Sequence, residues 1–546
     1  MRASIGLGLF ALVGFVACGT DTGNTTSEGH APGSSMPGGG DHGTSTDPTE
    51  PGAPGEPGTP GAPSDDPSDP ETPPAPIAKG ISVKDVAVFQ AVKVPVVSGG
   101  ELVSPASRKA PVVAKRGGMI RVYVQPDASW TPKEVTAELR LVAEGTKFPI
   151  IRDTKRISGP SREEDPTSTF NLEVPGESLP AGVTFQVALT APDGQKAEMV
   201  ESSEGRYPRD GEFASLGAEV AGKLRVVLVP VKYDADGSGR TPPLGAAELE
   251  LYKKRMMRLY PTSEVELTAH APMPWDGQIA NNGNGFPNVL RAITQLRSKD
   301  GVDKDVYYYG LLAPKASMAA YCGGGCVTGL SAVVDNANDS SMRASIGIGF
   351  GNDESANTMA HEIGHAHGRE HAPCGGPQGV DPRFPYQGGA IGAWGYDIFE
   401  KTLIEPSKGR DIMGYCRNEW VSDYTYNAFF ERISAISIEK HVATPDQAPA
   451  SAAPKQAAHY RVATLGANGD MTWEGDLDLD EEPSGGEIRQ ATFFAESGVE
   501  LGTRPTRFFR FDHLPGGFVF VPKDDVVEAT RWKAIAVEGI ANKLAR

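Results

Sequence analysis

The sequence predicts a multidomain chain whose folded part is a β-sandwich, then an α/β domain with a mixed sheet, then a small β domain. The length of 546 residues is more than one hydrophobic core normally serves. Short strand-like runs give way to alternating strand and helix patterns near residue 220, and an Ala/Pro-rich segment begins near residue 441. We therefore expect domains over 80–220, 221–440 and 459–546, with a linker over 441–458.

The first of these domains is expected to consist of short strands. Its apolar runs are short, and clusters of Gly, Pro, Ser and Asp separate them, which is typical of a β-sandwich. The expected strands are Val83–Val92, Met119–Val124, Val135–Val142 and Val183–Leu189. Residues 80–218 contain no Cys and no His, so this part has no cysteine with which to block a metal further along the chain. We expect an accessory module.

The second domain begins with a strand–helix–strand–helix–strand pattern, which predicts a mixed sheet covered by helices. The expected strands are Leu224–Val231, Val265–Ala269, Val306–Leu312, Val327–Val334 and Ala344–Phe350. The expected helices are Ala246–Tyr260, Pro287–Ser298 and Glu354–His367. Among these elements, Val327–Val334 is either plain sheet structure or an edge strand able to pair with an extended substrate backbone.

The third domain is predicted to be a small β domain, with strands at Tyr460–Ala463, Ala491–Phe494 and Phe518–Val521. Its segment Asp476–Asp480 alternates acidic and apolar residues, which fits a strand with a solvated acidic face better than a calcium site. Asp234–Gly239 in the preceding domain lacks the later ligands of a calcium loop, so a polar turn is favoured there. Calcium is therefore conceivable but unsupported.

The N-terminus resembles a bacterial lipoprotein signal. A short basic start precedes the apolar run Ile5–Ala17, which is too short to span a membrane, and Cys18 follows at once. The resemblance implies a signal peptide over 1–17, cleavage before Cys18 and lipid attached to that cysteine. The alternative is an ordinary secretory signal with an incidental cysteine. The expected destination is the outer membrane or cell surface of a bacterium.

A lipid-anchored linker is expected over 18–79. Residues 19–78 hold 12 Gly, 13 Pro and ten acidic residues but no Lys or Arg, so they cannot bury enough apolar surface to fold. The chain as a whole carries a formal net charge of −18, which argues against nucleic acid as a partner because phosphate binding needs a basic face. Membrane contact is expected only through the anchor.

Four cysteines remain once Cys18 is set aside, an even number in an oxidising compartment. Three pairings are possible. Cys322 and Cys326 flank three glycines and could close on each other, which would leave Cys374 and Cys416 to pair. A zinc site made of all four cysteines is the alternative, although their spacing is poor for one.

The segment His361–His371 carries the chemistry, with four of the ten histidines in eleven residues. On a helix, His361 and His365 are separated by about 40° of rotation and ~6 Å of rise, so both imidazoles can bind one ion. Glu362 would stand beside that ion, where a general base is needed. Gly368 can end the helix and let His371 return as a third ligand. His367 would lie on the side of the helix away from His361 and is not expected to be a ligand. The alternative to a metal site is a histidine-rich helix with no function.

This pattern, H-E-x-x-H-x-x-G-x-x-H, resembles the zinc signature of the metzincin metalloproteases. Those proteases also carry a methionine turn beneath the metal, and Asp411-Ile412-Met413-Gly414-Tyr415-Cys416 is similar to it. The resemblance covers about 222–440. It implies one catalytic Zn²⁺ held by His361, His365 and His371 over the floor residue Met413. The residues after His371 match none of the familiar subfamilies, so the subfamily stays open.

The resemblance also implies roles for neighbouring residues. Glu362 would be the general base, and Tyr415 matches a tyrosine that some metzincins place near the zinc, where it could donate to the oxyanion. The third ligand and the methionine turn approach each other in metzincins, which implies a Cys374–Cys416 disulfide. Reduction of that bridge would then loosen zinc.

Two function classes follow from these residues. The first is a zinc-dependent endopeptidase that hydrolyses extracellular proteins or glycoproteins. The second is a surface adhesive or glycan-binding lipoprotein whose zinc site is structural or vestigial. The intact Glu362 favours the first, because a structural site has no need of a base.

Overall fold

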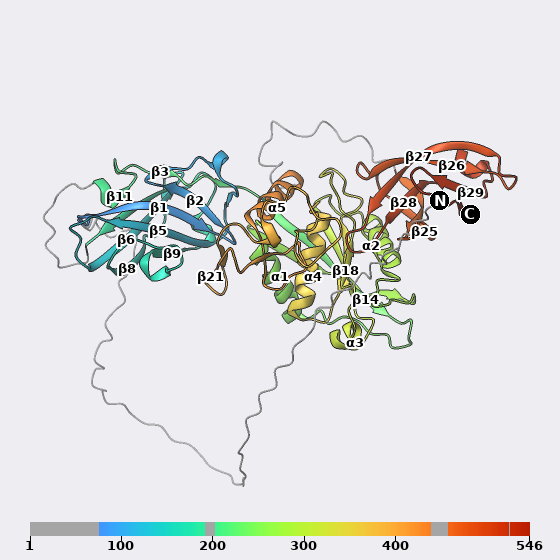
Figure 1. The fold of residues 1–546 in the computed structure, drawn as a ribbon, viewed down its shortest axis with the longest axis horizontal. Coiled ribbons are helices and arrows are strands. Elements are labelled where there is room, and N and C mark those ends of the chain that lie inside the picture. Colours follow the sequence, from blue (N-terminus) through green and yellow to red (C-terminus); the bar gives the residue numbers. More distant parts are fainter. Residues whose placement is uncertain (1–75, 192–202, 438–456, 524) are drawn as a thin grey trace, which may run out of the picture. The chain divides into compact units, whose positions relative to one another are not determined.

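The computed structural model describes residues 76–191, 203–437, 457–523 and 525–546. The expected signal peptide and Cys18, all but the end of the 18–79 linker, and nearly all of the 441–458 linker lie outside these residues. The described residues belong to one compact unit that is rich in β structure and has few helices (Figure 1). No helix within the described ranges is long and apolar enough to cross a membrane.

The N-terminal part is built from two antiparallel sheets around one core. The strand order is β3-β2-β1-β5-β9 in one sheet and β11-β10-β6-β7 in the other, where β8 also pairs with β6 and β12 with β10. The longer strands are β1 (Ile81–Phe89), β2 (Lys93–Ser98), β5 (Gly118–Pro126), β6 (Lys133–Ala143), β8 (Ile151–Ile157), β9 (Phe170–Val174) and β10 (Thr184–Thr190). The short ones are β3 (Glu101–Leu102), β7 (Thr146–Lys147), β11 (Arg206–Tyr207) and β12 (Ala214–Ser215); β4 (Val112–Val113) pairs with β13 (Ala218–Glu219).

The central part contains a mixed sheet of order β15-β14-β17-β19-β18, with β16 beside β14. Its strands are β14 (Lys223–Tyr233), β15 (Glu264–Ala269), β16 (Met273–Trp275), β17 (Val306–Leu312), β18 (Gly329–Ser331) and β19 (Ala344–Ile348). All pairs are parallel except β18 with β19. The helices are α1 (Ala246–Leu259), α2 (Phe286–Asp300), α3 (Met318–Cys322), α4 (Asp353–Ala366) and α5 (Asp423–Ile436). Small two-stranded pairs join β20 (Gly395–Asp397) to β21 (Thr402–Ile404) and β22 (Arg410–Asp411) to β23 (Glu419–Trp420).

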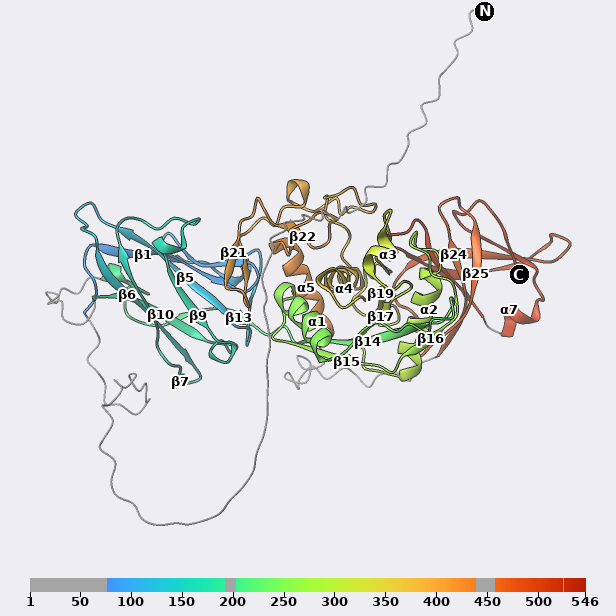
Figure 2. The same ribbon diagram turned by 90° about the horizontal axis from the view of Figure 1, so that it is seen from below.

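Strand β17 shows how this sheet is packed. All seven of its residues are buried, as expected for a strand covered on both faces. Tyr307 and Tyr309 join the core that includes α1, α4 and α5, whereas Tyr308 and Leu312 join the core that includes α2. The helices therefore lie on opposite faces of the sheet, as Figure 2 shows.

The C-terminal part is a seven-stranded sheet of order β25-β24-β28-β27-β26-β29-β30. Its elements are β24 (Ala458–Leu465), β25 (Met471–Leu479), β26 (Glu487–Phe494), β27 (Glu500–Arg510), β28 (Gly517–Pro522), α7 (Asp525–Ala529), β29 (Ala534–Val537) and β30 (Leu544–Ala545). Its inner side chains Tyr460, Phe509 and Phe518 share a core with α2 and the β17–β19 region. This sheet and the central sheet are thus packed as one body.

The strand expected over Val327–Val334 is shorter than predicted. Only Gly329–Ser331 forms β18, because the following residues turn to pair with the C-terminal part: Ala332 bridges Phe511, and the Val333 amide donates to the Arg510 carbonyl oxygen at 3.2 Å. The two acidic segments form ordinary structure. Asp234 and Asp236 accept bonds from their own turn, and Asp476 and Asp478 lie on β25.

Candidate metal centre

Helix α4 is fixed at both ends by local chemistry. The Asn352 side chain caps it by accepting from the Ser355 amide, and Asp353 and Glu354 supply negative charge to its first turn. The chain turns away from the helix at Gly368, whose φ is +82°. A Cβ at Gly368 would lie 2.7 Å from the Val334 carbonyl oxygen, so the turn that leads to His371 needs glycine for space as well as conformation.

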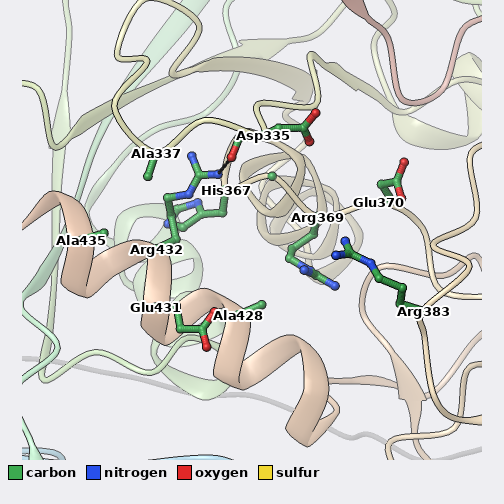
Figure 3. A pocket seen from close by; sticks show the side chains of 11 residues that line it. Asp335, Ala337, His367, Arg369, Glu370, Arg383, Ala428, Glu431, Arg432 and Ala435 are labelled. Carbon is green, nitrogen blue, oxygen red and sulfur yellow. Dashed lines mark hydrogen bonds between the residues drawn. The ribbon is translucent and has the colours of Figure 1, made fainter. Parts of the chain in front are cut away.

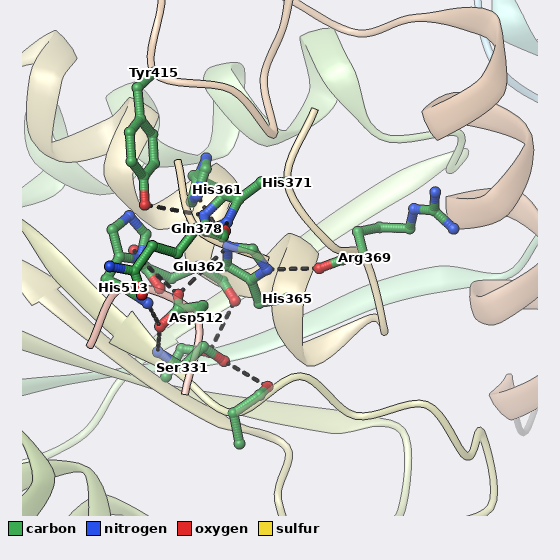
Figure 4. A network of polar contacts seen from close by, with 12 residues as sticks. Ser331, His361, Glu362, His365, Arg369, His371, Gln378, Tyr415, Asp512 and His513 are labelled. Carbon is green, nitrogen blue, oxygen red and sulfur yellow. Dashed lines mark hydrogen bonds and ion pairs between the residues drawn. The ribbon is translucent and has the colours of Figure 1, made fainter. Parts of the chain in front are cut away.

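Three histidines converge at the end of this helix (Figure 4). The Nε2 atoms of His361 and His365 lie 3.0 Å apart, and the ring centroids of His365 and His371 are 4.6 Å apart. All three residues are buried. Burial lowers the pKa of His365 to about 4 and that of His371 to about 2, so both rings are neutral near pH 7 and available as ligands.

Each of these rings is oriented by a backbone carbonyl. The Nδ1–H of His361 donates to the Ile412 carbonyl oxygen at 2.6 Å. The Nδ1–H of His365 donates to the Arg369 carbonyl oxygen at 2.5 Å, and that of His371 to the Gln378 carbonyl oxygen at 2.6 Å. Because a carbonyl oxygen can only accept, the proton is on Nδ1, and the lone pair of each Nε2 is left for a metal. Three neutral imidazole nitrogens directed at one point are a donor set that suits Zn²⁺.

Glu362 lies beside the three rings, in a fully buried position. Neither carboxylate oxygen has a hydrogen-bond partner in good geometry. Burial, followed by the nearby Asp512 charge, raises its pKa well above the usual value. A Cβ on Gly329 of β18 would overlap this carboxylate, so the glycine gives Glu362 its space. A buried carboxyl that has no hydrogen bond and a raised pKa is equipped to exchange a proton.

The segment after the helix contributes Met413, which packs on α4, and Tyr415, which lies next to His371. Met413 is buried, and Asp411 holds its turn by accepting from the Met413 amide at 2.9 Å. The Ala372 amide donates to the Met413 carbonyl oxygen at 2.9 Å, which joins the segment after His371 to the methionine turn. The Tyr415 hydroxyl lies 3.1 Å from His371 Nε2. Burial raises the Tyr415 pKa, so the phenol stays protonated and can donate.

Two disulfides are present, and they are the pairs expected from the sequence. Cys374 and Cys416 are joined with a Cα–Cα distance of 5.6 Å, and Cys322 and Cys326 with one of 4.9 Å. The alternative of a four-cysteine zinc site does not apply. The first bridge lies next to Tyr415, whose amide also donates to the Cys374 carbonyl oxygen at 2.8 Å.

His367 is directed away from the cluster. Its Nδ1 bonds the Ile363 carbonyl oxygen at 2.8 Å, and its ring stacks on Tyr307 with centroids 4.4 Å apart. It borders a cavity of about 660 Å³ at the end of α4, drawn in Figure 3. The arginines there already have partners: Arg432 donates to the Val334 and Asp335 carbonyl oxygens, and Arg369 pairs with Asp381. We assign no role to this cavity.

Sequence reasoning missed two residues of the site, Asp512 and His513. Both come from the turn between β27 and β28, and His513 joins the three helix-region histidines in one group of potential ligand atoms within 4.8 Å of one another. Nothing in the local sequence marks them. The only available signal is that His513 is the sole histidine after His459.

The Asp512 side chain is buried and has partners from both β18 and its own turn. Its carboxylate accepts from the Ser331 amide at 3.1 Å and bonds His513 Nδ1 at 2.7 Å. Burial alone would raise its pKa, but His513 and His365 hold the pKa well below the usual value. Asp512 is therefore the charged member of the acidic pair that it forms with Glu362.

A family model, Peptidase M66, matches residues 289–434, which include α4, His371 and Met413. The protein is a zinc metallopeptidase. The match and the buried histidine cluster together confirm the predicted enzyme class and the predicted zinc cofactor. No curated protein matches the chain significantly. The matched segment lies within the central α/β part.

Proposed function

We propose that the protein is a metzincin-type endopeptidase that hydrolyses extracellular proteins or glycoproteins with Glu362 as general base. The observation that carries this proposal is the position of Glu362. It is buried, its carboxylate has no hydrogen bond, and it lies beside three imidazoles whose Nδ1 atoms are bonded to backbone carbonyls, so that their Nε2 atoms face the cluster. The floor at Met413 and the bend at Gly368 also agree with a metzincin arrangement.

The chain's own residues account for the proton movements of peptide hydrolysis. His361, His365 and His371 would hold Zn²⁺, which as a Lewis acid lowers the pKa of a water molecule and polarises a peptide carbonyl. Glu362 would take a proton from the attacking water and pass it to the leaving amine nitrogen. Tyr415 would donate its hydroxyl proton in a hydrogen bond to the developing oxyanion. Because the site is buried, the interactions of Glu362 and of Tyr415 with the reacting groups are stronger than they would be in water.

A bacterial lipoprotein location is part of the proposal. It is supported by the sequence at Cys18, by the acidic Gly/Pro-rich segment that follows, and by two disulfides, which form in oxidising compartments. An enzyme anchored in this way would meet proteins and glycoproteins outside the cell. A surface adhesin with a structural zinc site is the second candidate, but no observation favours it over the peptidase.

The test is cleavage of casein and of a mucin by the purified protein, with and without a zinc chelator. We expect cleavage that the chelator abolishes and that added Zn²⁺ restores. Glu362→Gln should retain zinc but lose activity by a factor of a thousand or more, since it removes the base while keeping the shape. Glu354→Gln, an exposed carboxylate on the same helix, is the matched control. Full activity of Glu362→Gln at equal zinc content would contradict the general-base role.

A further inference from the structure

The turn that follows β27 enters the site by pairing with the edge of the central sheet. Ala332, next to β18, forms an antiparallel bridge with Phe511, and the Val333 amide donates to the Arg510 carbonyl oxygen at 3.2 Å. The Asp512 amide donates to the Ser331 carbonyl oxygen at 3.3 Å. A segment of the chain itself thus occupies the edge that was one of the two alternatives for Val327–Val334, an edge able to pair with an extended peptide.

Further contacts hold this turn in place. Arg510 forms an ion pair with Glu370, next to His371, with an N–O distance of 2.6 Å. A Cβ at Gly283 would lie 2.8 Å from a Leu514 methyl group, so Leu514 packs closely on the loop before α2. Phe511 is 2% exposed and lies in the core shared by the two sheets. The turn is therefore held at both ends of the Asp512-His513 dipeptide.

The rings of the four histidines have the spacing of one tetrahedral site. Four imidazoles with Zn–N distances of about 2.0–2.1 Å would have ring centroids about 5 Å apart. The observed distances from His513 are 5.0 Å to His361, 5.8 Å to His365 and 5.3 Å to His371. Among the three helix-region histidines the distances are 4.7, 5.3 and 4.6 Å. His513 thus completes the tetrahedron.

His513 is also oriented in the way that ligand histidines are. Its Nδ1 bonds the Asp512 carboxylate at 2.7 Å, and the same nitrogen lies 3.4 Å from a Glu362 oxygen. A carboxylate on Nδ1 fixes the ring and raises the basicity of Nε2, the arrangement found behind many zinc-bound histidines. Figure 4 shows the Asp512–His513 pair facing the other three rings.

We propose that His513 is a fourth protein ligand of the zinc, and that the peptidase is closed for as long as His513 stays bound. A catalytic zinc keeps one position open, whereas a site with four protein ligands is closed. In the closed form His513 fills the open position, Arg510–Asp512 fills the peptide edge, and Asp512 stands against Glu362. The proposal rests on the zinc site and extends the proposed function to its regulation.

The experiment compares the full protein with His513→Ala, and uses His459→Ala as the control because His459 is an exposed histidine of the same sheet. Zinc affinity is measured by competition with a chromophoric chelator. Access to the metal is measured by azide titration of the Co²⁺-substituted proteins, followed through the visible absorption of Co²⁺. Casein cleavage is the third readout.

We expect His513→Ala to bind zinc about tenfold or more weakly, to bind azide where the parent does not, and to cleave casein several-fold faster. Asp512→Asn should also weaken zinc binding, because it removes the carboxylate that orients the His513 ring. If His513→Ala is unstable, His513→Gln serves in its place. Arg510→Ala, which loosens the turn without removing a ligand, should give intermediate azide access.

Equal zinc affinity and equal azide binding in parent and His513→Ala would overturn the proposal. Slower cleavage with unchanged metal properties would also overturn it, because His513 would then assist the reaction instead of blocking it. The proposed function is judged separately. If neither the parent nor any variant cleaves casein or mucin, the proposed peptidase activity is wrong. The zinc and azide measurements still decide the role of His513.

Discussion

Met413 packs directly against Gly364 of α4, so closely that a Cβ at position 364 would overlap the methionine sulfur. The same Cβ would lie 3.3 Å from the Phe429 ring of α5. Gly364 stands one position before His365, so the methionine turn and the ligand helix are in contact at the level of His365. The glycine is required here by space and not by backbone conformation.

Gly364→Ala should therefore disturb the metal centre without changing any ligand. An added methyl group in a packed core typically costs about 1–3 kcal/mol. We expect a lower free energy of unfolding by that amount and weaker zinc binding, measured by urea denaturation and chelator competition. Gly324→Ala is a suitable control, because a Cβ there meets nothing within 4 Å. Unchanged zinc affinity in Gly364→Ala would show that the turn adapts freely.

The ligand set can be tested by metal analysis. We expect His361→Ala, His365→Ala and His371→Ala each to reduce zinc content severely, because each removes an Nε2 that is fixed toward the cluster. His367→Ala should keep its zinc, since its ring stacks on Tyr307 instead. Plasma emission spectrometry of the four purified variants gives the answer. A zinc-free His367→Ala protein, folded by circular dichroism, would contradict this assignment.

The parts of the site that the sequence predicted are those set by local geometry. Helical spacing places His361 and His365 on one face, and Gly368 reverses the chain toward His371 within a few residues. His513 reaches the same point from a different sheet through tertiary packing, and no periodicity records such packing. A single sequence therefore indicates three of the four converging rings.

The strands of the fold also show that sequence patterns do not record tertiary packing. Strand β17 was predicted because it is apolar throughout, but β8 was missed because its sequence is I-R-D-T-K-R-I. That strand is held by polar cross-strand pairs, such as Thr136 with Thr154 at 2.7 Å. β18 was predicted too long because Ala332 and Val333 pair with the C-terminal part instead of continuing the sheet.

The Cys374–Cys416 bridge should support both stability and zinc binding. Its sequence separation is 42 residues, which corresponds to roughly 4 kcal/mol in the chain-entropy model. We expect the Cys374→Ser/Cys416→Ser variant to unfold at lower denaturant and to lose zinc to a chelator more readily. The Cys322→Ser/Cys326→Ser variant is the control, because its separation is 4 residues. Equal zinc retention in the two variants would separate the bridge from the metal centre.

His367 should make stability depend on acidity. Burial lowers its pKa from 6.5 to about 3, so its contribution is complete above pH 6.5 and is lost as the pH falls toward 3. At pH 5 the loss relative to neutral pH is about 2 kcal/mol. His367→Gln should remove this part of the pH dependence, as measured by urea unfolding at pH 7 and pH 5. Parallel pH profiles for parent and variant would show that His367 does not titrate as described.

Cys18 should anchor the protein. If lipid is attached there, the Cys18→Ser precursor expressed in a Gram-negative host should leave the membrane fraction, whereas Thr20→Ser should remain in it. Fractionation with immunoblotting measures the distribution, and mass spectrometry of the N-terminal peptide detects the acyl chains. Retention of Cys18→Ser in the membrane fraction would place the anchor elsewhere.

The core shared by α2, the β17–β19 region and the C-terminal sheet has a practical consequence for recombinant work. A fragment that ends at Ser437 would expose apolar side chains that Phe509, Phe511 and Phe518 now cover, among them Leu330 and Ala332. Exposed apolar surface of this kind promotes aggregation. The segment that matches the peptidase family is therefore not a separable module, and the smallest soluble enzyme must retain the C-terminal sheet.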